Sequence, residues 1–316
     1  MHRIITFFCL LCFCGTSSAA EKPIRILFIA GQPSHAAGIH EFNAGCELLA
    51  QDLEQYVSEK TFGNSTAKMP KITAAVHRNA KPGDTFALED ADVIVVYSDG
   101  GGRYPLQGLE DRLEKLRRSG KGFVFLHYAL CGSQGNDTVK PPALPPSAAF
   151  ILNATGGVYE IFYSVNPVYR AEFKSLPEHP ITRGVLPFAM KDEFYFNMRF
   201  LNNMSTEEII AQPPGTQNRQ RALQAILVAT PPDTVRRGPD GAHSGNPMVR
   251  NRCGKAEILA WSFQREDGGR GFGCTGGDRH SNWANPSFRK LILNAIVWCA
   301  GADIPAAGLT TPPRDN

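Results

Sequence analysis

Residues 24–45 read IRILFIAGQPSHAAGIHEFNAG, and this stretch decides the fold class of the chain. The short apolar run at 24–30 predicts a buried strand, and a glycine and a proline break it before helical periodicity begins. His35, His40 and Glu41 therefore lie where a strand gives way to a helix. Open α/β sheets bind ligands at this point, so the segment is a candidate site. A simpler interpretation is a capping loop with one hydrogen-bonded histidine.

Strands and helices alternate along the first half of the chain. Alternation of this kind favours a parallel sheet covered on both faces, and hence an α/β fold. The predicted elements are strands at 24–30 and 72–77, a strand running into a glycine turn at 92–102, a strand at 122–129, and helices at 41–58 and 106–119.

The second half is richer in strands and loops. A Gly- and Pro-rich loop is expected at 132–146, lying over the strand ends as an insertion or lid. Strands are expected at 168–174, within 188–200, and at 223–229, 256–263 and 269–277, with a polar loop at 232–246. The last helix is well marked, because Asn285 can cap it, Pro286 suits its first turn, and apolar residues recur on one face as far as Cys299.

The first twenty residues, MHRIITFFCLLCFCGTSSAA, have the pattern of a secretory signal peptide. The apolar run at 4–14 is too short to span a membrane, and small residues that fit a cleavage site follow it. No later segment is long and apolar enough to cross a bilayer. We therefore expect a periplasmic or secreted protein without a membrane span.

Charge and cysteine content narrow the range of partners. The formal net charge is +3 and falls to +2 when the leader and its Arg3 are removed, so nothing indicates binding to nucleic acid or to a membrane. The cysteines that remain are widely spaced and odd in number, which predicts buried thiols rather than a disulfide framework. The expected partner is a small molecule, and the sequence does not specify an oligomeric state.

Polar side chains recur at the ends of the predicted strands. Because the carboxyl ends of parallel strands meet at one edge of a sheet, we expect these side chains to share a pocket. They are His35, His40 and Glu41 after the first strand, Asp99 and glycines 100–102 after the third, His127 and Tyr128 at the end of the fourth, Asp192 and Glu193 in DEFYF, and Asp278 and His280 after the last.

Imidazoles and carboxylates together allow two kinds of chemistry. They can bind a divalent metal such as zinc, whose open coordination position activates water or polarises a carbonyl. They can equally act as general acid and base without a metal. The chain has no H-E-x-x-H motif and no close Cys/His spacing, so both interpretations stay open. Its glycine-rich segments also lack the features of a dinucleotide fingerprint or a P-loop.

With these residues identified, the chain resembles the ThuA-like, or trehalose utilisation, family. The likeness rests on SHAAGIHEFNAG, YSDGGG, FLHYA, HPITRG, DEFYFNMRF, AHSGNP, GGRGFGCTGG and NWANPSFRKLILNAIVW, which together cover nearly the whole chain after the leader. The resemblance implies a flavodoxin-like, class I glutamine amidotransferase-like three-layer sandwich with a mostly parallel central sheet. It also implies a role in the catabolism of trehalose and related disaccharides, through 3-keto-sugar intermediates.

Two departures from the related patterns bear on the chemistry. Amidotransferases of this superfamily place a nucleophilic cysteine on the turn after a central strand, where this chain has His127, and Cys131 comes four residues later. Amide or ester chemistry through a cysteine or serine is therefore disfavoured. The family usually has Gly-Gly-His where this chain has Gly-Gly-Asp278, so a carboxylate can take the place of that imidazole.

The resemblance and the strand-end residues together suggest roles. The expected catalytic residues are Glu41, His127, Asp192, Glu193 and His280; the expected substrate-binding residues are His40, Asp99, Gly101, Tyr128, His243, Arg270 and Asp278; and a divalent metal, if used, is expected on His35, His127 and His280. Residues 21–303 are expected to form the ThuA-like domain, and 304–316 a disordered tail.

The leading functional hypothesis is a secreted enzyme that acts on a sugar or 3-keto-sugar, from trehalose or a related glycoside, by isomerisation, elimination or hydrolysis. Carboxylates and imidazoles suit proton transfer next to a sugar carbonyl. The alternative is a non-catalytic carbohydrate-binding or accessory protein that retains the pocket.

Overall fold

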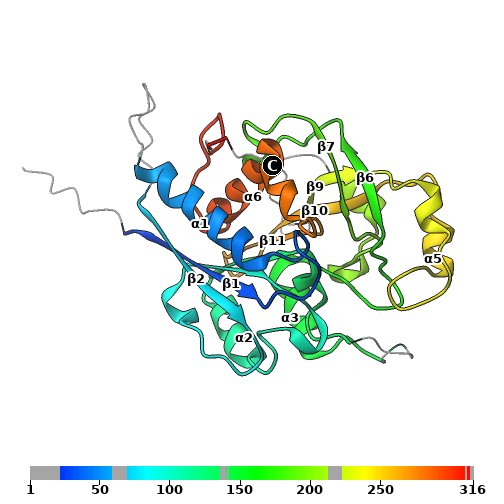
Figure 1. Ribbon diagram of the computed structural model, residues 1–316, viewed down its shortest axis with the longest axis horizontal. Coiled ribbons are helices and arrows are strands. Elements are labelled where there is room, and N and C mark those ends of the chain that lie inside the picture. The colour runs from blue at the N-terminus through cyan, green and yellow to red at the C-terminus, as the bar shows by residue number, and fades with distance from the viewer. Residues whose placement is uncertain are drawn as a thin grey trace, which may run out of the picture.

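A seven-stranded sheet with the order β2-β1-β3-β4-β11-β10-β9 runs through the middle of the protein (Figure 1). The structure is a computed structural model that describes residues 22–58, 70–135, 140, 142–212, 223–309 and 312–313. The predicted leader at 1–20 and part of the predicted lid at 132–146 lie outside these residues. The strands are β1 (Ile24–Gly31), β2 (Ile72–Ala80), β3 (Val93–Tyr97), β4 (Gly122–Leu126), β9 (Leu223–Ala229), β10 (Glu257–Gln264) and β11 (Arg270–Cys274).

The sheet is mostly parallel, as predicted. β1 pairs in parallel with β2 and β3, and β4 pairs in parallel with β3 and β11, while β10 runs antiparallel to both of its neighbours. The carboxyl ends of β1, β3, β4 and β11 therefore lie at the same edge of the sheet, side by side.

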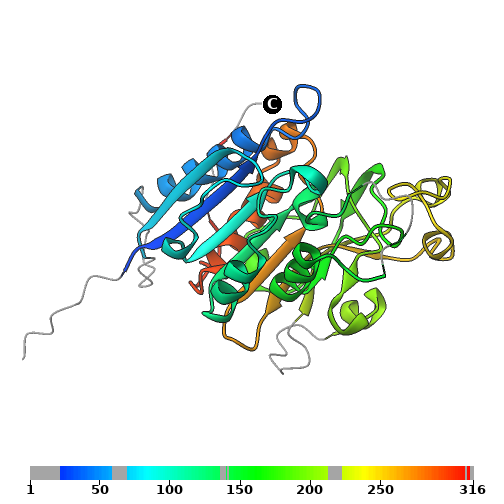
Figure 2. The same cartoon turned by 90° about the horizontal axis from the view of Figure 1, so that it is seen from below.

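Helices cover both faces of this sheet and complete three layers (Figures 1 and 2). The helices are α1 (Phe42–Ser58), α2 (Glu110–Arg118), α3 (Pro146–Thr155), α4 (Thr206–Ile210), α5 (Pro247–Arg250) and α6 (Pro286–Cys299). Alternate residues of the central strands enter two cores: Val124 and Leu126 of β4 pack with α1 and α6, and Phe123 and Phe125 pack with α2 and α3. This alternation is the pattern of a strand buried on both faces.

A smaller set of strands lies beside the sheet. β6 (Val168–Phe173) and β7 (Phe188–Glu193) form an antiparallel hairpin, and β5 (Gly157–Val158) pairs with β8 (Arg199–Phe200). The inward residues of the hairpin, such as Tyr169, Phe173 and Met190, join the core on the α1 and α6 side. This packing fixes the end of β7, where Glu193 lies.

Two boundaries differ from the sequence-based expectation. The predicted loop ends at Pro146, where helix α3 begins; this helix was not predicted. Pro146 occupies its first turn, and Gly156 ends it in the left-handed region at φ 82°. The tail predicted to be disordered from residue 304 is ordered further than expected. Ile304 and Leu309 are buried, and Leu309 N–H donates to the side chain of Asn294.

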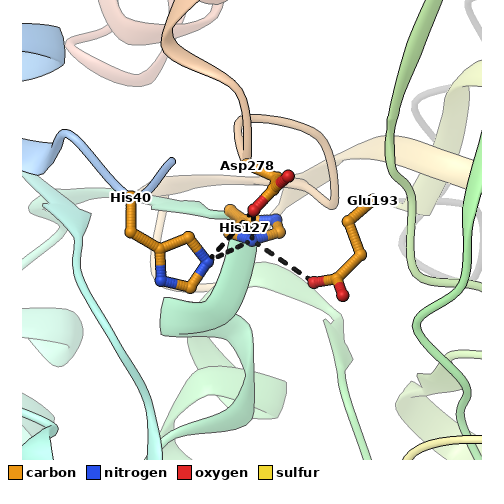
Figure 3. Close-up of side chains that lie close together, drawn as sticks. All are labelled: His40, His127, Glu193 and Asp278. Carbon is orange, nitrogen blue, oxygen red and sulfur yellow. Dashed lines mark hydrogen bonds and ion pairs between the residues drawn. The ribbon is translucent and has the colours of Figure 1, made fainter. Parts of the chain in front are cut away.

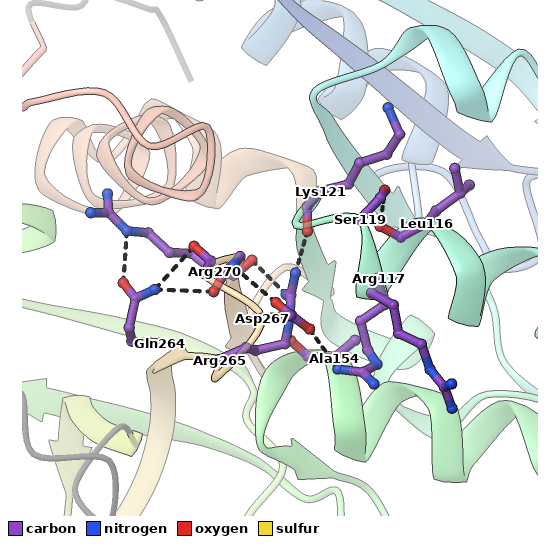
Figure 4. A network of polar contacts seen from close by, with 12 residues as sticks. Leu116, Arg117, Ser119, Lys121, Ala154, Gln264, Arg265, Asp267 and Arg270 are labelled. Atoms are coloured by element: carbon purple, nitrogen blue, oxygen red, sulfur yellow. Dashed lines mark hydrogen bonds and ion pairs between the residues drawn. The ribbon is translucent and has the colours of Figure 1, made fainter.

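Arg270 begins β11, at the opposite end of the sheet from the carboxyl strand ends, so the structure does not place it with the other predicted substrate-binding residues. Its side chain contacts that of Gln264 instead (Figure 4). Its guanidinium donates to the Gln264 side chain at 2.9 Å and to the Trp298 carbonyl at 2.9 Å. The neighbouring Arg265 is 4% exposed and donates to the carbonyls of Ala154 and Arg270, which ties the β10–β11 turn to α3. These arginines are structural.

In the described ranges, no helix has both the length and the apolar character to cross a membrane. Cys46, Cys131, Cys274 and Cys299 are buried, and Cys253 is partly buried. The expectation of buried thiols is therefore confirmed for the first four.

Replacement of the α6 cap tests how the last helix is held. The Asn285 side-chain oxygen accepts from the N–H groups of Ser287 at 3.0 Å and Phe288 at 3.1 Å. Asn285→Ala is expected to lower the free energy of unfolding by about 1 kcal/mol, whereas Asn285→Ser keeps an acceptor and restores most of it. Urea denaturation measures both variants, and equal losses in the two would contradict the capping role.

Candidate functional site

Four side chains meet at the carboxyl edge of the sheet because four adjacent strands end there. His40 follows β1, Asp99 follows β3, His127 follows β4 and Asp278 follows β11. His40, Asp99, His127 and Asp278 are all buried, with exposures of 6% or less. The structure thus brings these four predicted residues together at this edge.

Two loops are paired backbone to backbone to hold His40 beside Asp278. His40 N–H donates to the carbonyl of Asp278 at 3.0 Å, and His280 N–H donates to the carbonyl of Gly38 at 2.9 Å. Ile39 and Arg279 form an isolated antiparallel bridge between these bonds. The loop after β1 and the loop after β11 therefore act as one rigid unit.

The two imidazoles point their Nε2 atoms at each other, 3.0 Å apart (Figure 3). The other nitrogen of each ring is engaged with an acceptor. His40 Nδ1 lies 2.8 Å from Asp99 Oδ1, and His127 Nδ1 lies 3.0 Å from the Thr275 carbonyl oxygen. A carbonyl only accepts, so His127 Nδ1 carries a proton, and its Nε2, when the ring is neutral, presents a lone pair.

Carboxylates and a phenol surround this contact. Asp278 Oδ1 lies 3.4 Å from His40 Nε2 and 3.9 Å from His127 Nε2, and Glu193 Oε2 lies 3.7 Å from His127 Nε2. The ligand atoms of His40, His127, Glu193 and Asp278 all lie within 4.8 Å of one another, and we call these residues the four-residue cluster. Tyr195 Oη adds a contact of 3.2 Å to His127 Nε2.

Both histidines have unusual backbones. His40 has φ 51° and His127 has φ 54°, in the left-handed region that non-glycine residues seldom occupy. Such strain costs of order 1–3 kcal/mol at each position and is concentrated at functional sites. His127 thus occupies the sharp turn after a central strand, as the sequence predicted, and Cys131 lies buried behind it at the end of a 3-10 helix (His127–Cys131).

Burial dominates the electrostatics of the site. It lowers the pKa of His127 well below the usual value, with a smaller contribution from His40, so the His127 ring is neutral. Burial followed by the nearby charge of Asp278 raises the pKa of Glu193 to about 8. Clustered carboxylates and facing imidazole lone pairs are both stabilised by positive charge placed between them. Either a shared proton or a bound cation can supply it.

Asp192 positions the loop rather than facing the cluster. Its carboxylate is fully buried and accepts from the N–H groups of Gly277 at 2.7 Å, Arg279 at 3.2 Å and Glu193 at 3.1 Å. Burial raises the pKa of Asp192 to about 6 in spite of these bonds. By accepting from three backbone N–H groups, the Asp192 carboxylate holds the backbone next to Asp278 and Glu193 in place.

His35 lies at the exposed mouth of the site. Its ring centroid is 3.9 Å from that of His40, and the Ser34 hydroxyl contacts Nδ1 of both rings, at 2.7 Å for His35 and 3.1 Å for His40. With His40 and Asp99 it forms a second group of potential ligands. The structure thus brings His35 to His40 rather than to His127.

Glu41 and His280 lie outside both groups of potential ligands. Glu41 Oε1 accepts from Gly38 N–H at 3.0 Å and so braces the loop after β1. His280 begins a 3-10 helix (His280–Ala284), and its backbone rather than its ring joins that loop. The predicted metal set of His35, His127 and His280 is therefore not the set that the fold assembles, because pairing of the two loops turns Asp278 inward in place of His280.

Three other predicted residues lie around the cluster. Gly101 has φ 64° and donates its N–H to Gly132 at 2.8 Å, and the Tyr128 ring lies beside His40 with centroids 6.3 Å apart. His243 is further out and contacts Tyr159 Oη at 3.2 Å. Tyr195 was missed by sequence reasoning, although it follows Glu193 by two residues, the spacing that puts extended residues on one side.

A family model described as trehalose utilisation (ThuA) matches residues 50–299. Among solved structures, the chain is similar to a ThuA-like protein from Bacteroides uniformis (14% identity, 91% of this chain and 96% of that chain covered, TM-score 0.49). It is also similar to one from Parabacteroides merdae (14%, 92% and 98%, 0.48) and to a cytoplasmic protein from Salmonella typhimurium (15%, 88% and 98%, 0.43). No curated protein matches the chain. Since the family model spans most of its length, the chain belongs to the trehalose utilisation (ThuA) family.

Proposed function

We propose that a divalent cation binds at the four-residue cluster and that the protein processes a sugar or 3-keto-sugar beside it. The observation that carries this proposal is the 3.0 Å contact between the Nε2 atoms of His40 and His127, each ring being anchored through Nδ1. Anchoring the distal nitrogen of a histidine on a carboxylate or carbonyl is the usual second layer of a metal site, since it fixes the ring and its tautomer.

The spacing of the cluster supports a cation more than a shared proton. In a tetrahedral zinc site with bonds of about 2.0–2.1 Å, ligand atoms lie roughly 3.3 Å apart. The distances of 3.0, 3.4, 3.7 and 3.9 Å among the ligand atoms of His40, His127, Glu193 and Asp278 bracket this value. A shared proton accounts for the contacts of His40 with His127 and Asp278, whereas a cation accounts for the approach of Glu193 to His127 as well.

Exposure divides the cluster into ligands and a reacting group. The side chains of His40, His127 and Asp278 are 3%, 0% and 9% exposed, and that of Glu193 is 24% exposed. Three buried ligands with one open side are typical of catalytic rather than structural metal sites. We therefore assign His40, His127 and Asp278 as the ligands, and Glu193 as the group that transfers a proton to or from the substrate.

A divalent cation bound to His40, His127 and Asp278 would polarise a substrate carbonyl or activate a water molecule. Tyr195 Oη lies beside His127 and is positioned to donate a hydrogen bond to a substrate oxygen. Glu193 is placed to exchange a proton at a carbon or oxygen of the sugar. These roles fit isomerisation, elimination or hydrolysis next to a sugar carbonyl, and trehalose or a related glycoside is the substrate class that family membership favours.

The leader pattern at 1–20 supports an extracytoplasmic site of action, in the periplasm or outside the cell. The proposed reaction therefore acts on carbohydrate before it reaches the cytoplasm.

Removing one ligand tests the metal. Elemental analysis of the purified protein is expected to show one divalent ion per chain. Asp278→Ala is expected to weaken zinc binding in calorimetry by more than about 100-fold, because loss of even a second-layer partner commonly costs 10–100-fold. Asp278→His replaces one ligand type by another and is expected to keep most of the affinity.

His280→Ala is the matched control, because His280 lies in the same loop but outside the cluster. Its affinity for zinc is expected to equal that of the unchanged protein. Absence of a stoichiometric ion, or equal loss in His280→Ala and Asp278→Ala, would contradict the metal assignment.

Turnover is tested with trehalose, other glucosides and their 3-keto forms. Glu193→Gln is expected to retain zinc binding and to lose roughly 10²–10⁴-fold in turnover, which is the usual contribution of a general acid or base. Product formation is followed by chromatography. If the unchanged protein binds these sugars and converts none, the accessory, carbohydrate-binding function is the correct one.

A further inference from the structure

A pocket of about 440 Å³ lies outside the four-residue cluster, and one of its lining residues, Asn166, contacts Glu193 of the cluster. Three segments line it: Asn166 with Pro167, Thr234 with Val235, and Gly238 with His243 and Ser244. Sites for small molecules commonly measure about 300–1,000 Å³. The pocket is therefore large enough for a sugar ring.

Asn166 connects this pocket to the cluster. Its Nδ2 donates to Glu193 Oε1 at 3.5 Å, and the other oxygen of Glu193 lies 3.7 Å from His127 Nε2. Asn166 therefore belongs to the lining of the pocket and to the surroundings of the cluster at the same time.

The chemistry of the lining selects a neutral ligand. Within the described ranges, none of the residues that line the pocket carries a carboxylate, ammonium or guanidinium group. Two other pockets of similar size are lined by charged groups, among them Lys22, Asp92 and Lys121 in one. Burial also lowers the pKa of His243, so its ring is neutral. Hydroxyl, amide and apolar groups together match a polyhydroxylated ring with one apolar face.

A chain of aromatic rings fixes the pocket relative to the cluster. The Tyr159 ring stacks with that of His243 at 5.9 Å and contacts that of Tyr195 at 5.2 Å, and Tyr195 Oη contacts His127 Nε2 at 3.2 Å. Tyr159 and Tyr195 are buried, at 1% and 2% exposure. A ligand in the pocket is thus held at a defined position from the reacting groups.

We propose that this pocket binds the second sugar unit of a disaccharide whose reacting ring lies at the four-residue cluster. This inference rests on the proposed function and specifies its substrate as a neutral glycoside of at least two units. It further implies that a monosaccharide glycoside with a small aglycone binds less well, because it leaves the pocket empty.

The test compares trehalose with methyl α-D-glucoside in calorimetry. The unchanged protein is expected to bind trehalose roughly tenfold more tightly. Thr234 is exposed, so Thr234→Trp can fill the pocket with little disturbance of the core and is expected to remove most of that preference. Ser244→Trp fills it from another segment and is expected to do the same. Thr85→Trp, at an exposed position outside the pocket lining, is the matched control and is expected to keep the preference.

Zinc binding measured on the same samples separates this inference from the proposed function. Thr234→Trp with normal zinc binding and a lost preference for trehalose supports the subsite. An unchanged protein that prefers neither sugar, or a Thr234→Trp variant that keeps the preference, overturns the subsite whether or not zinc binds. A lost preference in both tryptophan variants of a protein that binds no zinc supports the subsite while contradicting the metal centre.

Discussion

The approach of two imidazole nitrogens, His40 Nε2 and His127 Nε2, to 3.0 Å is the interaction on which the rest of the site depends. Burial keeps His127 neutral, and its Nδ1 donates to the Thr275 carbonyl, so its Nε2 turns a lone pair toward the Nε2 of His40, whose Nδ1 lies beside Asp99. A proton or a cation between the two Nε2 atoms stabilises this arrangement. The carboxyl group of Asp278, 3.4 Å from His40 Nε2, and that of Glu193, 3.7 Å from His127 Nε2, lie next to the same pair.

The fold supplies this arrangement through backbone geometry. Parallel strands end at one edge, and left-handed turns at His40 and His127 aim the two rings toward each other immediately after β1 and β4. The paired loops and the buried carboxylate of Asp192 then set the position of Asp278. Backbone strain and buried polar groups at the site cost free energy of folding. The hydrophobic cores on the two faces of the sheet offset that cost.

The sequence predicted those parts of the structure that depend on local pattern. The β1 strand, the parallel α/β class and the α6 helix with its Asn285 cap follow from apolar periodicity and capping residues, and all are present. His127 was placed correctly because it directly follows a strand. Helix α3 was not predicted, because it starts at the last proline of a stretch that has the composition of a loop.

Choices among neighbouring polar residues could not be predicted in the same way. Whether Asp278 or His280 faces His127 depends on pairing between loops more than 230 residues apart in the sequence, as the His40 to Asp278 bond shows. The inclusion of Glu193 depends likewise on how the β6–β7 hairpin packs against the sheet. Arg270 was expected to bind substrate although it begins its predicted strand, because a glycine-rich pattern does not reveal which end of the strand faces the site.

X-ray absorption spectroscopy of the zinc-loaded protein tests the central claim most directly. The account predicts two imidazole nitrogens and oxygen ligands at about 2.0–2.2 Å from the metal, with the imidazole signal lost in His127→Ala. A spectrum without histidine ligands, or one that is unchanged in His127→Ala, would show that the two facing imidazoles do not hold the cation.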